Sequence, residues 1–218
     1  MEGPGLIVFD VDGTLLPGTS CERLFFEHLL RKKIIGLRNI ISFAMRAMAL
    51  MPRGRAYVLK ANKGYLRGFS PDYMAGIGRE FFENQVIRKI SAKGISRIKE
   101  HHGDGDKVML LSGMPEFLLR NFSEYLSVNE YIGSTLEVNA DKFTGRTIGC
   151  FPLAEGKIEV LRPLLEKYSL NWPDLTAYAD HGLDRYLLEK VGHPVAVNPR
   201  DDLKRMAKRK GWPIESFD

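Results

Sequence analysis

Three short apolar runs predict strands that are buried on both faces. They cover residues 6–9, 107–111 and 175–179, and each is followed by a small or polar residue. Continuous apolar runs of this length are typical of strands in a parallel sheet, because helices cover both faces of such a sheet. Apolar residues recur at helical spacing over 116–126, 157–168 and 183–191.

The order of these segments predicts an α/β fold. Strands that alternate with helices form the repeating unit of a Rossmann-like, doubly wound parallel sheet. Ligands of such sheets bind beyond the carboxyl ends of the strands, so the residues after each apolar run are the first candidates for chemistry. A small hairpin or flap is predicted over 142–149, because Thr144-Gly145 separates two short apolar stretches.

The segment 18–102 departs from this alternation. It reads as consecutive helices separated by turn signals, and it has no run typical of a buried strand. We therefore predict a core of residues 1–17 and 103–218, with a helical cap domain of residues 18–102 inserted after the first strand.

Positive charge is concentrated in the predicted cap. The net charge of the 218-residue chain is +5, and no Asp or Glu occurs between His28 and Pro71. An anionic partner is expected near this segment. A membrane span over 34–51 is not expected, since Arg38 and Arg46 interrupt the apolar stretch and a charge at mid-bilayer costs about 2.5 to 3.5 kcal/mol. The bases are Arg31, Lys32, Lys33, Arg38, Arg46, Arg53, Arg55, Lys60, Lys63 and Arg67.

The remaining composition is that of a globular protein from a reducing compartment. Hydrophobic residues make up 44% of the chain and charged residues 27%. Two cysteines, Cys21 and Cys150, can form neither a disulfide framework nor a four-sulfur zinc site. Glu2 stands where a signal peptide needs bases, so a cytoplasmic location is predicted.

The first apolar run leads directly into Asp10-Val11-Asp12-Gly13-Thr14. Residues two apart on an extended chain point to the same side, so the carboxylates of Asp10 and Asp12 can share one pocket. Gly13 permits a sharp turn there. An Asp-Gly hairpin turn is the alternative, but the buried strand before the motif and the Thr-Leu after it favour a functional site.

This string resembles the opening motif, Asp-x-Asp-Gly-Thr, of the haloacid dehalogenase (HAD) superfamily of phosphatases that use an aspartate nucleophile. The resemblance continues in chain order with Ser112 after the second strand, Lys157 at the start of a helix, and Asp180 and Asp184 after the third strand. Each of these residues alone is common as a helix cap or a solvated side chain. Their order at the carboxyl ends of predicted strands carries the argument.

The resemblance implies a Mg²⁺-dependent phosphomonoester hydrolase with an aspartyl-phosphate intermediate. A phosphate monoester is a dianion, so an attacking carboxylate needs a cation beside it, and Mg²⁺ suits oxygen ligands. Asp10 is implied as nucleophile and metal ligand. Asp12 is implied to give a backbone carbonyl to the metal, while its side chain acts as general acid and base.

The later motifs are implied to hold the phosphate and the metal. Ser112, with the neighbouring amide of Gly113, would bind phosphoryl oxygens, and Thr14 would add a hydrogen bond. Lys157 would neutralise charge on phosphate and nucleophile. Asp180 would ligate Mg²⁺ directly, and Asp184 would ligate it or orient a ligand or water.

One position departs from the family pattern. The family often has a small hydroxylated residue after the acid of the fourth motif, where His181 follows Asp180 here. A loop role for His181 is favoured over direct contact with the substrate.

Within the superfamily, the inserted helices and the ending over 193–199 and 211–214 resemble the phosphoserine-phosphatase-like subfamily. Members that hydrolyse phosphoserine carry a glutamate nine residues after the nucleophile, where this chain has Thr19, and two glycines after the second-motif serine, where it has Gly113-Met114. Phosphoserine itself is therefore not indicated as the substrate, and a phosphorylated small molecule or lipid is expected.

Two alternatives stay open for the basic cap and for the reaction. The segment 25–51 resembles part of the membrane-associated phosphatidylglycerophosphatase C, so it could touch an anionic bilayer, or its apolar stripe could pack internally. A phosphotransferase or mutase would share the first half-reaction. A nucleic-acid-binding protein with a vestigial hydrolase core is less favoured, because Phe43, Tyr57 and Tyr65 form no stacking motif.

Overall fold

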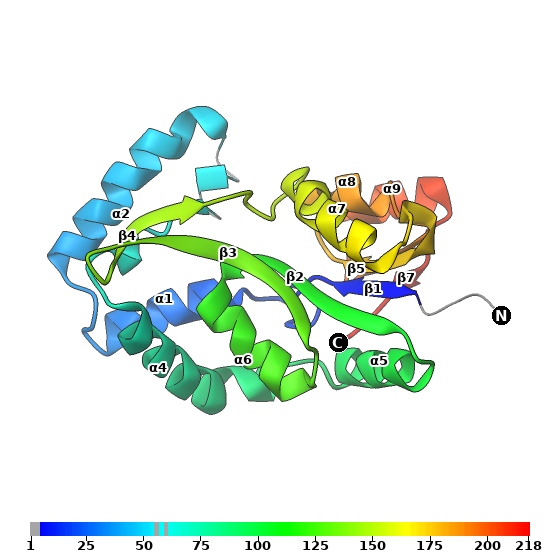
Figure 1. Ribbon diagram of the computed structural model, residues 1–218, viewed down its shortest axis with the longest axis horizontal. Coiled ribbons are helices and arrows are strands. Elements are labelled where there is room, and N and C mark those ends of the chain that lie inside the picture. Colours follow the sequence, from blue (N-terminus) through cyan, green and yellow to red (C-terminus); the bar gives the residue numbers. More distant parts are fainter. Residues whose placement is uncertain (1–4, 55–56, 59–60) are drawn as a thin grey trace.

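A seven-stranded sheet of order β4-β3-β2-β1-β5-β6-β7 runs through the molecule (Figure 1). The structure is a computed structural model that describes residues 5–54, 57–58 and 61–218; Glu2, Arg55 and Lys60 of the sequence predictions lie outside these residues. All neighbouring strands are parallel except β3 and β4. The strands are β1 (Leu6–Phe9), β2 (Lys107–Pro115), β3 (Glu130–Asn139), β4 (Lys142–Ile148), β5 (Leu175–Ala179), β6 (His193–Val197) and β7 (Ile214–Glu215).

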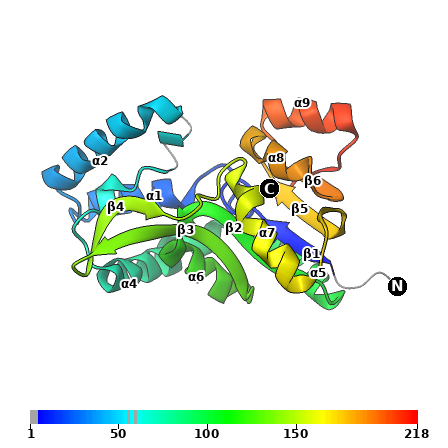
Figure 2. The ribbon, with the colours of Figure 1, turned by 45° about the horizontal axis from the view of Figure 1, so that its top comes forward.

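Helices cover both faces of the sheet, which confirms the predicted doubly wound α/β fold (Figure 2). In β1, Ile7 and Phe9 belong to the apolar cluster on one face, while Leu6 and Val8 belong to the cluster on the other. This alternation follows from the two-residue period of a strand. One face is covered by α5 (Ala92–Gly103) and α6 (Glu116–Leu126), the other by α7 (Gly156–Tyr168), α8 (Arg185–Leu188) and α9 (Asp201–Lys210).

Among the described residues, helices joined by turns and short loops make up the segment between β1 and β2, and no strand is present there. Within 18–102, α5 packs against β2, and the division into a core and a cap domain at residues 17 and 102 stays a proposal. No described helix is long and apolar enough to span a membrane. The elements before α5 are α1 (Cys21–Arg31), α2 (Leu37–Leu50), η1 (Met51–Arg53), η2 (Gly64–Leu66), α4 (Pro71–Phe81), η3 (Phe82–Val86) and η4 (Ile87–Lys89).

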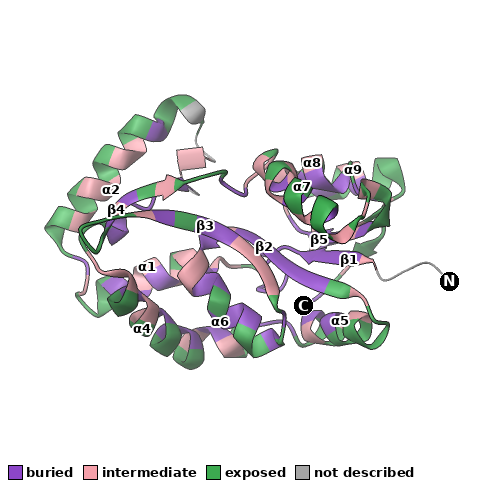
Figure 3. Ribbon diagram, in the orientation of Figure 1, coloured by how far each residue is buried: buried purple, intermediate pink, exposed green. Residues whose placement is uncertain are grey.

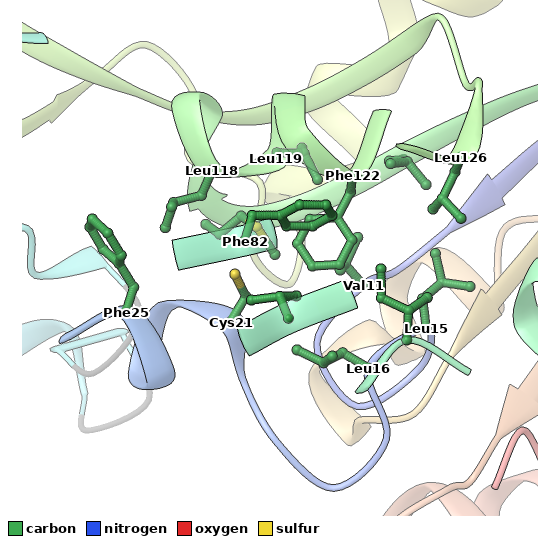
Figure 4. Packing of buried hydrophobic residues seen from close by; sticks show 14 of the residues in the cluster. Val11, Leu15, Leu16, Cys21, Phe25, Phe82, Leu118, Leu119, Phe122 and Leu126 are labelled. Carbon is green, nitrogen blue, oxygen red and sulfur yellow. The ribbon is translucent and has the colours of Figure 1, made fainter. Parts of the chain in front are cut away.

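Aromatic packing joins this insertion to the rest of the molecule. The rings of Phe82 and Phe122 lie edge to face with centroids 4.9 Å apart, between the insertion and α6 (Figure 4). Cys21 is buried in the same cluster. Because such aromatic pairs bury large areas, the insertion and the sheet share one continuous core.

A hairpin is present, formed by β3 and β4, and it ties the insertion to the sheet. Its turn lies at Ala140-Asp141, so the predicted turn at Thr144-Gly145 was wrong; both of these residues lie inside β4. Phe143 of β4 exchanges two backbone hydrogen bonds with the insertion, donating to Phe69 O and accepting from Gly68 N, both at 2.8 Å. A Cβ on Gly145 would lie 2.9 Å from the Cα of Gly64, so only glycine permits this approach. The hairpin therefore fixes the insertion beside the sheet (Figure 2).

Candidate active site

The opening motif turns sharply at the carboxyl end of β1. The backbone N–H of Asp10 donates to Tyr178 O at 2.9 Å, which continues the pairing with β5 for one residue. Gly13 has a φ of +88°, and a Cβ there would lie 2.2 Å from Oδ2 of Asp180. Glycine is therefore required both for the turn and for the close approach of Asp180.

Four predicted residues from distant parts of the chain meet at this edge. Asp10, Asp180 and Asp184 are buried, and one carboxylate oxygen from each lies within 4.8 Å of the others. The ammonium of Lys157 donates to Asp10 Oδ1 at 2.6 Å and lies 2.7 Å from Asp184 Oδ1. The second strand brings Ser112 and Gly113 to the wall of the same pocket.

Burial and crowding shift the pKa values of these groups. Burial, opposed by the charge of Lys157, raises the pKa of Asp10 to about 6. Burial, together with the charges of Asp10 and Asp184, raises the pKa of Asp180 to about 8. Burial alone would lower the pKa of Lys157, but the two neighbouring carboxylates raise it above its usual value. Lys157 therefore stays charged, and in the described part of the chain it is the one buried cation that pairs with these acids.

This donor set fits a hard divalent cation. Mg²⁺ takes carboxylate and carbonyl oxygens, and burial together with the charges of the neighbouring carboxylates raises the pKa values of Asp10 and Asp180, so that joint ionisation of the acids is disfavoured without a further cation. A cation held by Asp10, Asp180 and Asp184 would supply that charge. The nearby guanidinium of Arg200 lies 3.7 Å from Asp180 Oδ2, but its side chain is 67% exposed.

Asp12 lines the same pocket as Asp10, but its carboxylate is directed toward α1. Its oxygens accept hydrogen bonds from Ser20 Oγ and from the backbone N–H of Cys21, both at 2.8 Å. These contacts satisfy donors at the helix start. The second acid of the motif thus links the strand end to the insertion, and metal ligation by its carbonyl stays a prediction.

The other predicted residues occupy different positions around the pocket. Ser112 is buried inside β2, which is longer than predicted, and its Oγ accepts from Met114 N at 3.3 Å. Thr14 is fully buried, and its hydroxyl has no hydrogen-bond partner among the described residues. His181 lines the pocket and accepts from Leu183 N at 3.0 Å. Their contacts with a phosphate stay predictions.

The insertion supplies a pocket wall that sequence reasoning missed. The pocket has a volume of about 480 Å³, and the insertion contributes Glu22, Phe26, Phe43, Asn62 and Tyr65 to its lining. Nothing in the spacing of these residues marks them, because only the folded insertion brings α1, α2 and η2 together.

Glu22 is the centre of a buried polar cluster in this wall. It accepts from Tyr65 Oη at 2.9 Å and pairs with the ammonium of Lys63. Lys63 also donates to Gly113 O at 3.3 Å. Burial raises the pKa of Glu22, while Lys63 opposes the rise. The cluster therefore joins the insertion to the strand end that carries Ser112.

Comparison with known proteins agrees with this geometry. The family model described as "haloacid dehalogenase-like hydrolase" matches residues 7–189. A histidinol-phosphatase of Neisseria meningitidis is 29% identical over 97% of this chain and 98% of its own length. Phosphoserine phosphatase SerB1 of Mycobacterium tuberculosis is 28% identical over 96% of this chain and 70% of its own. A crystal structure of a Bordetella pertussis protein of unknown function shares the fold, with a TM-score of 0.84 and 24% identity over both complete chains.

Proposed function

Because the chain belongs to the haloacid dehalogenase-like hydrolase family, we propose that this phosphatase is Mg²⁺-dependent and works through an aspartyl-phosphate on Asp10. The observation that carries the proposal is the contact of Lys157 with both Asp10 and Asp184, beside Asp180 and at the carboxyl ends of the parallel strands β1 and β5. A cytoplasmic location is part of the same proposal.

In the first half-reaction, a carboxylate oxygen of Asp10 attacks phosphorus while the bond to the leaving oxygen breaks. Asp12 protonates that oxygen, and Lys157 offsets the charge on nucleophile and phosphate. The hydroxyls of Ser112 and Thr14 and the amide of Gly113 hold the phosphoryl oxygens.

In the second half-reaction, Asp12 removes a proton from water, which attacks the phosphorus. The bond to Asp10 breaks, and inorganic phosphate leaves. Mg²⁺ would be held by Asp10, Asp180, Asp184 and the Asp12 carbonyl, and it would offset the negative charge of nucleophile and phosphate. Two measurements test this scheme: phosphate release should require Mg²⁺, and acid quenching should trap a phosphoenzyme. Turnover of an aryl phosphate in excess EDTA would contradict it.

Mg²⁺ is expected to raise the Tm of the protein, and more at pH 8 than at pH 6. In the metal-free protein the pKa of Asp180 is raised from 3.8 to about 8, so the folded chain holds a proton that the unfolded chain has released. Stability therefore falls as pH rises from about 4 to 8, and a bound cation opposes this loss. At Mg²⁺ about 100 times Kd, the gain is about 2.7 kcal/mol, or roughly 5 to 11 °C.

Differential scanning fluorimetry with and without Mg²⁺ measures this shift. Asp180→Asn should abolish it, while Asp141→Asn, an exposed residue between β3 and β4, should retain it. An unchanged Tm at both pH values would contradict a metal site at these acids.

We further propose that the substrates are phosphate monoesters of small alcohols that carry an amino group. Histidinol phosphate and phosphoserine, the compounds in the two relatives' names, both have an amine on the carbon next to the phosphorylated one. The carboxylate of Glu22 on the pocket wall supports this class. This carboxylate accepts hydrogen bonds from Tyr65 and Lys63. Because a carboxylate can accept about four hydrogen bonds, acceptor positions remain for the ammonium group of a substrate.

Glu22→Gln is expected to raise KM for such amino-alcohol phosphates by about 10- to 100-fold, the range of a lost hydrogen bond to a charged group. Its effect on p-nitrophenyl phosphate, which has no amine, should be within about threefold. Because the change leaves Lys63 buried without its acid, Glu22→Gln with Lys63→Gln is the companion variant. Equal loss on both substrates in the companion would contradict a role in selecting the amine.

A further inference from the structure

Much of α2 is exposed to solvent (Figure 3), and its outer face is apolar. Leu37 is 72% exposed, Met45 59% and Met48 63%. At 3.6 residues per turn, the large exposed apolar side chains of this helix, together with Met51, fall within an arc of about 140°. They are Leu37, Ile40, Ile41, Met45, Met48 and Met51; we refer to them as the α2 outer face.

Internal packing accounts for the opposite side of the helix only. Phe43 packs against the core and lines the active-site pocket, and Leu50 is buried. The helix lies at the edge of the molecule (Figure 1), and apart from η1, which continues it, its main described neighbours are η2 and β4. The apolar residues of α2 therefore form two faces: an inner face that packs against the core, and an outer face that has no partner within the described residues.

Positive charge borders the α2 outer face. Lys33, Arg38 and Arg67 are exposed, and Arg38 and Arg67 pair with no acid among the described residues. Arg38 and Arg67 line a groove of about 420 Å³ together with Ile41, Met45 and Phe69. A groove with guanidinium groups beside apolar side chains matches the phosphate and the first acyl carbons of an anionic phospholipid.

From this surface we propose that the α2 outer face docks the protein on an anionic phospholipid bilayer, with its apolar side chains between the acyl chains and its bases among the headgroups. Charge favours this occupant over a second copy of the chain. A self-pair through α2 would bring two acid-free segments of residues 28–71 together, so that like charges face each other. A bilayer contact would leave the pocket, which Phe43 lines, about one helix diameter of 10 Å from the membrane.

Vesicle sedimentation with the full chain tests the proposal. The wild type should pellet with vesicles of phosphatidylglycerol and phosphatidylcholine at low salt, and at least tenfold less with phosphatidylcholine alone. Ile41→Asp with Met48→Asp should reduce pelleting at least tenfold. The matched control, Val138→Asp with Ile148→Asp, replaces residues that are 47% and 48% exposed on the hairpin and should pellet like the wild type.

Three results would overturn the proposal: no binding of the wild type to anionic vesicles, equal loss in the hairpin control, or binding that is unaffected by the α2 changes. If the wild type is dimeric and does not bind lipid, and the variant Ile41→Asp with Met48→Asp is monomeric, the α2 outer face is a self-association surface instead. Release of phosphate from p-nitrophenyl phosphate should be the same in all variants, because none of these residues lines the pocket. This readout separates failure of docking from failure of the proposed catalysis.

Discussion

Asp10→Asn is expected to lower phosphate release by about 10⁴-fold or more, the scale of loss when a catalytic nucleophile is removed. Asparagine has the same shape, and its Oδ1 can still accept from Lys157. What it lacks is a charged oxygen that can form a bond to phosphorus. Steady-state release from p-nitrophenyl phosphate with Mg²⁺ measures the loss, and acid quenching should trap no phosphoenzyme.

The fold should survive this substitution. Burial raises the pKa of Asp10 to about 6, so its ionised form is disfavoured in the folded protein, and a neutral side chain removes that cost. The Tm should therefore equal or exceed that of the wild type at pH 7.5, while Asp141→Asn should keep full activity. Retained turnover in Asp10→Asn would remove this residue as the nucleophile.

Asp12→Asn should divide the two half-reactions. When Asp12 can no longer act as general acid, attack of Asp10 on an alkyl phosphate should slow by about 10² to 10⁴-fold, the usual range for a general acid or base. The p-nitrophenolate group leaves without a proton, so the first half-reaction persists on that substrate. Rapid mixing should then show a burst of about one equivalent of p-nitrophenol, followed by slow turnover as the phosphoenzyme accumulates.

Ser20→Ala is the control for a structural effect of Asp12. It removes the Ser20 hydroxyl hydrogen bond to Asp12 Oδ2 and leaves the acid in place. If the role of Asp12 were only to hold the start of α1, both variants would lose activity alike and neither would show a burst. The catalytic role requires that Ser20→Ala stays within about tenfold of the wild type.

The sequence was informative where local pattern and topology point the same way. The strands β1 and β5 begin and end where the apolar runs do, and Asp10 and Asp180 follow them directly. Residues after parallel strands must meet at one edge, so the convergence of Asp10 and Asp180 was predictable without coordinates. Lys157 opens α7 after the antiparallel hairpin, and only the family resemblance placed it at the same edge. The predicted strand at 107–111 was too short, because β2 continues through Ser112 to Pro115 with an irregular register against β3.

Other features depend on contacts that no local pattern encodes. β6 and β7 were not predicted, since His193–Val197 contains a proline and Ile214–Glu215 is only a two-residue pairing. The predicted helix at 183–191 is shorter in the structure, where η6 (Gly182–Asp184) is followed by α8, which ends at Leu188. Glu22 and Tyr65 meet because the whole insertion folds over the strand ends.

The pairing of β4 with Gly68 and Phe69 has a consequence for protein engineering. Backbone hydrogen bonds hold the insertion to a ribbon that is distant in the chain, and Gly145 lies against Gly64 without space for a side chain. Grafting residues 18–102 alone onto another scaffold would leave those backbone groups unpaired. A functional chimaera of this phosphatase should therefore carry the ribbon of residues 130–148 together with the helices it supports.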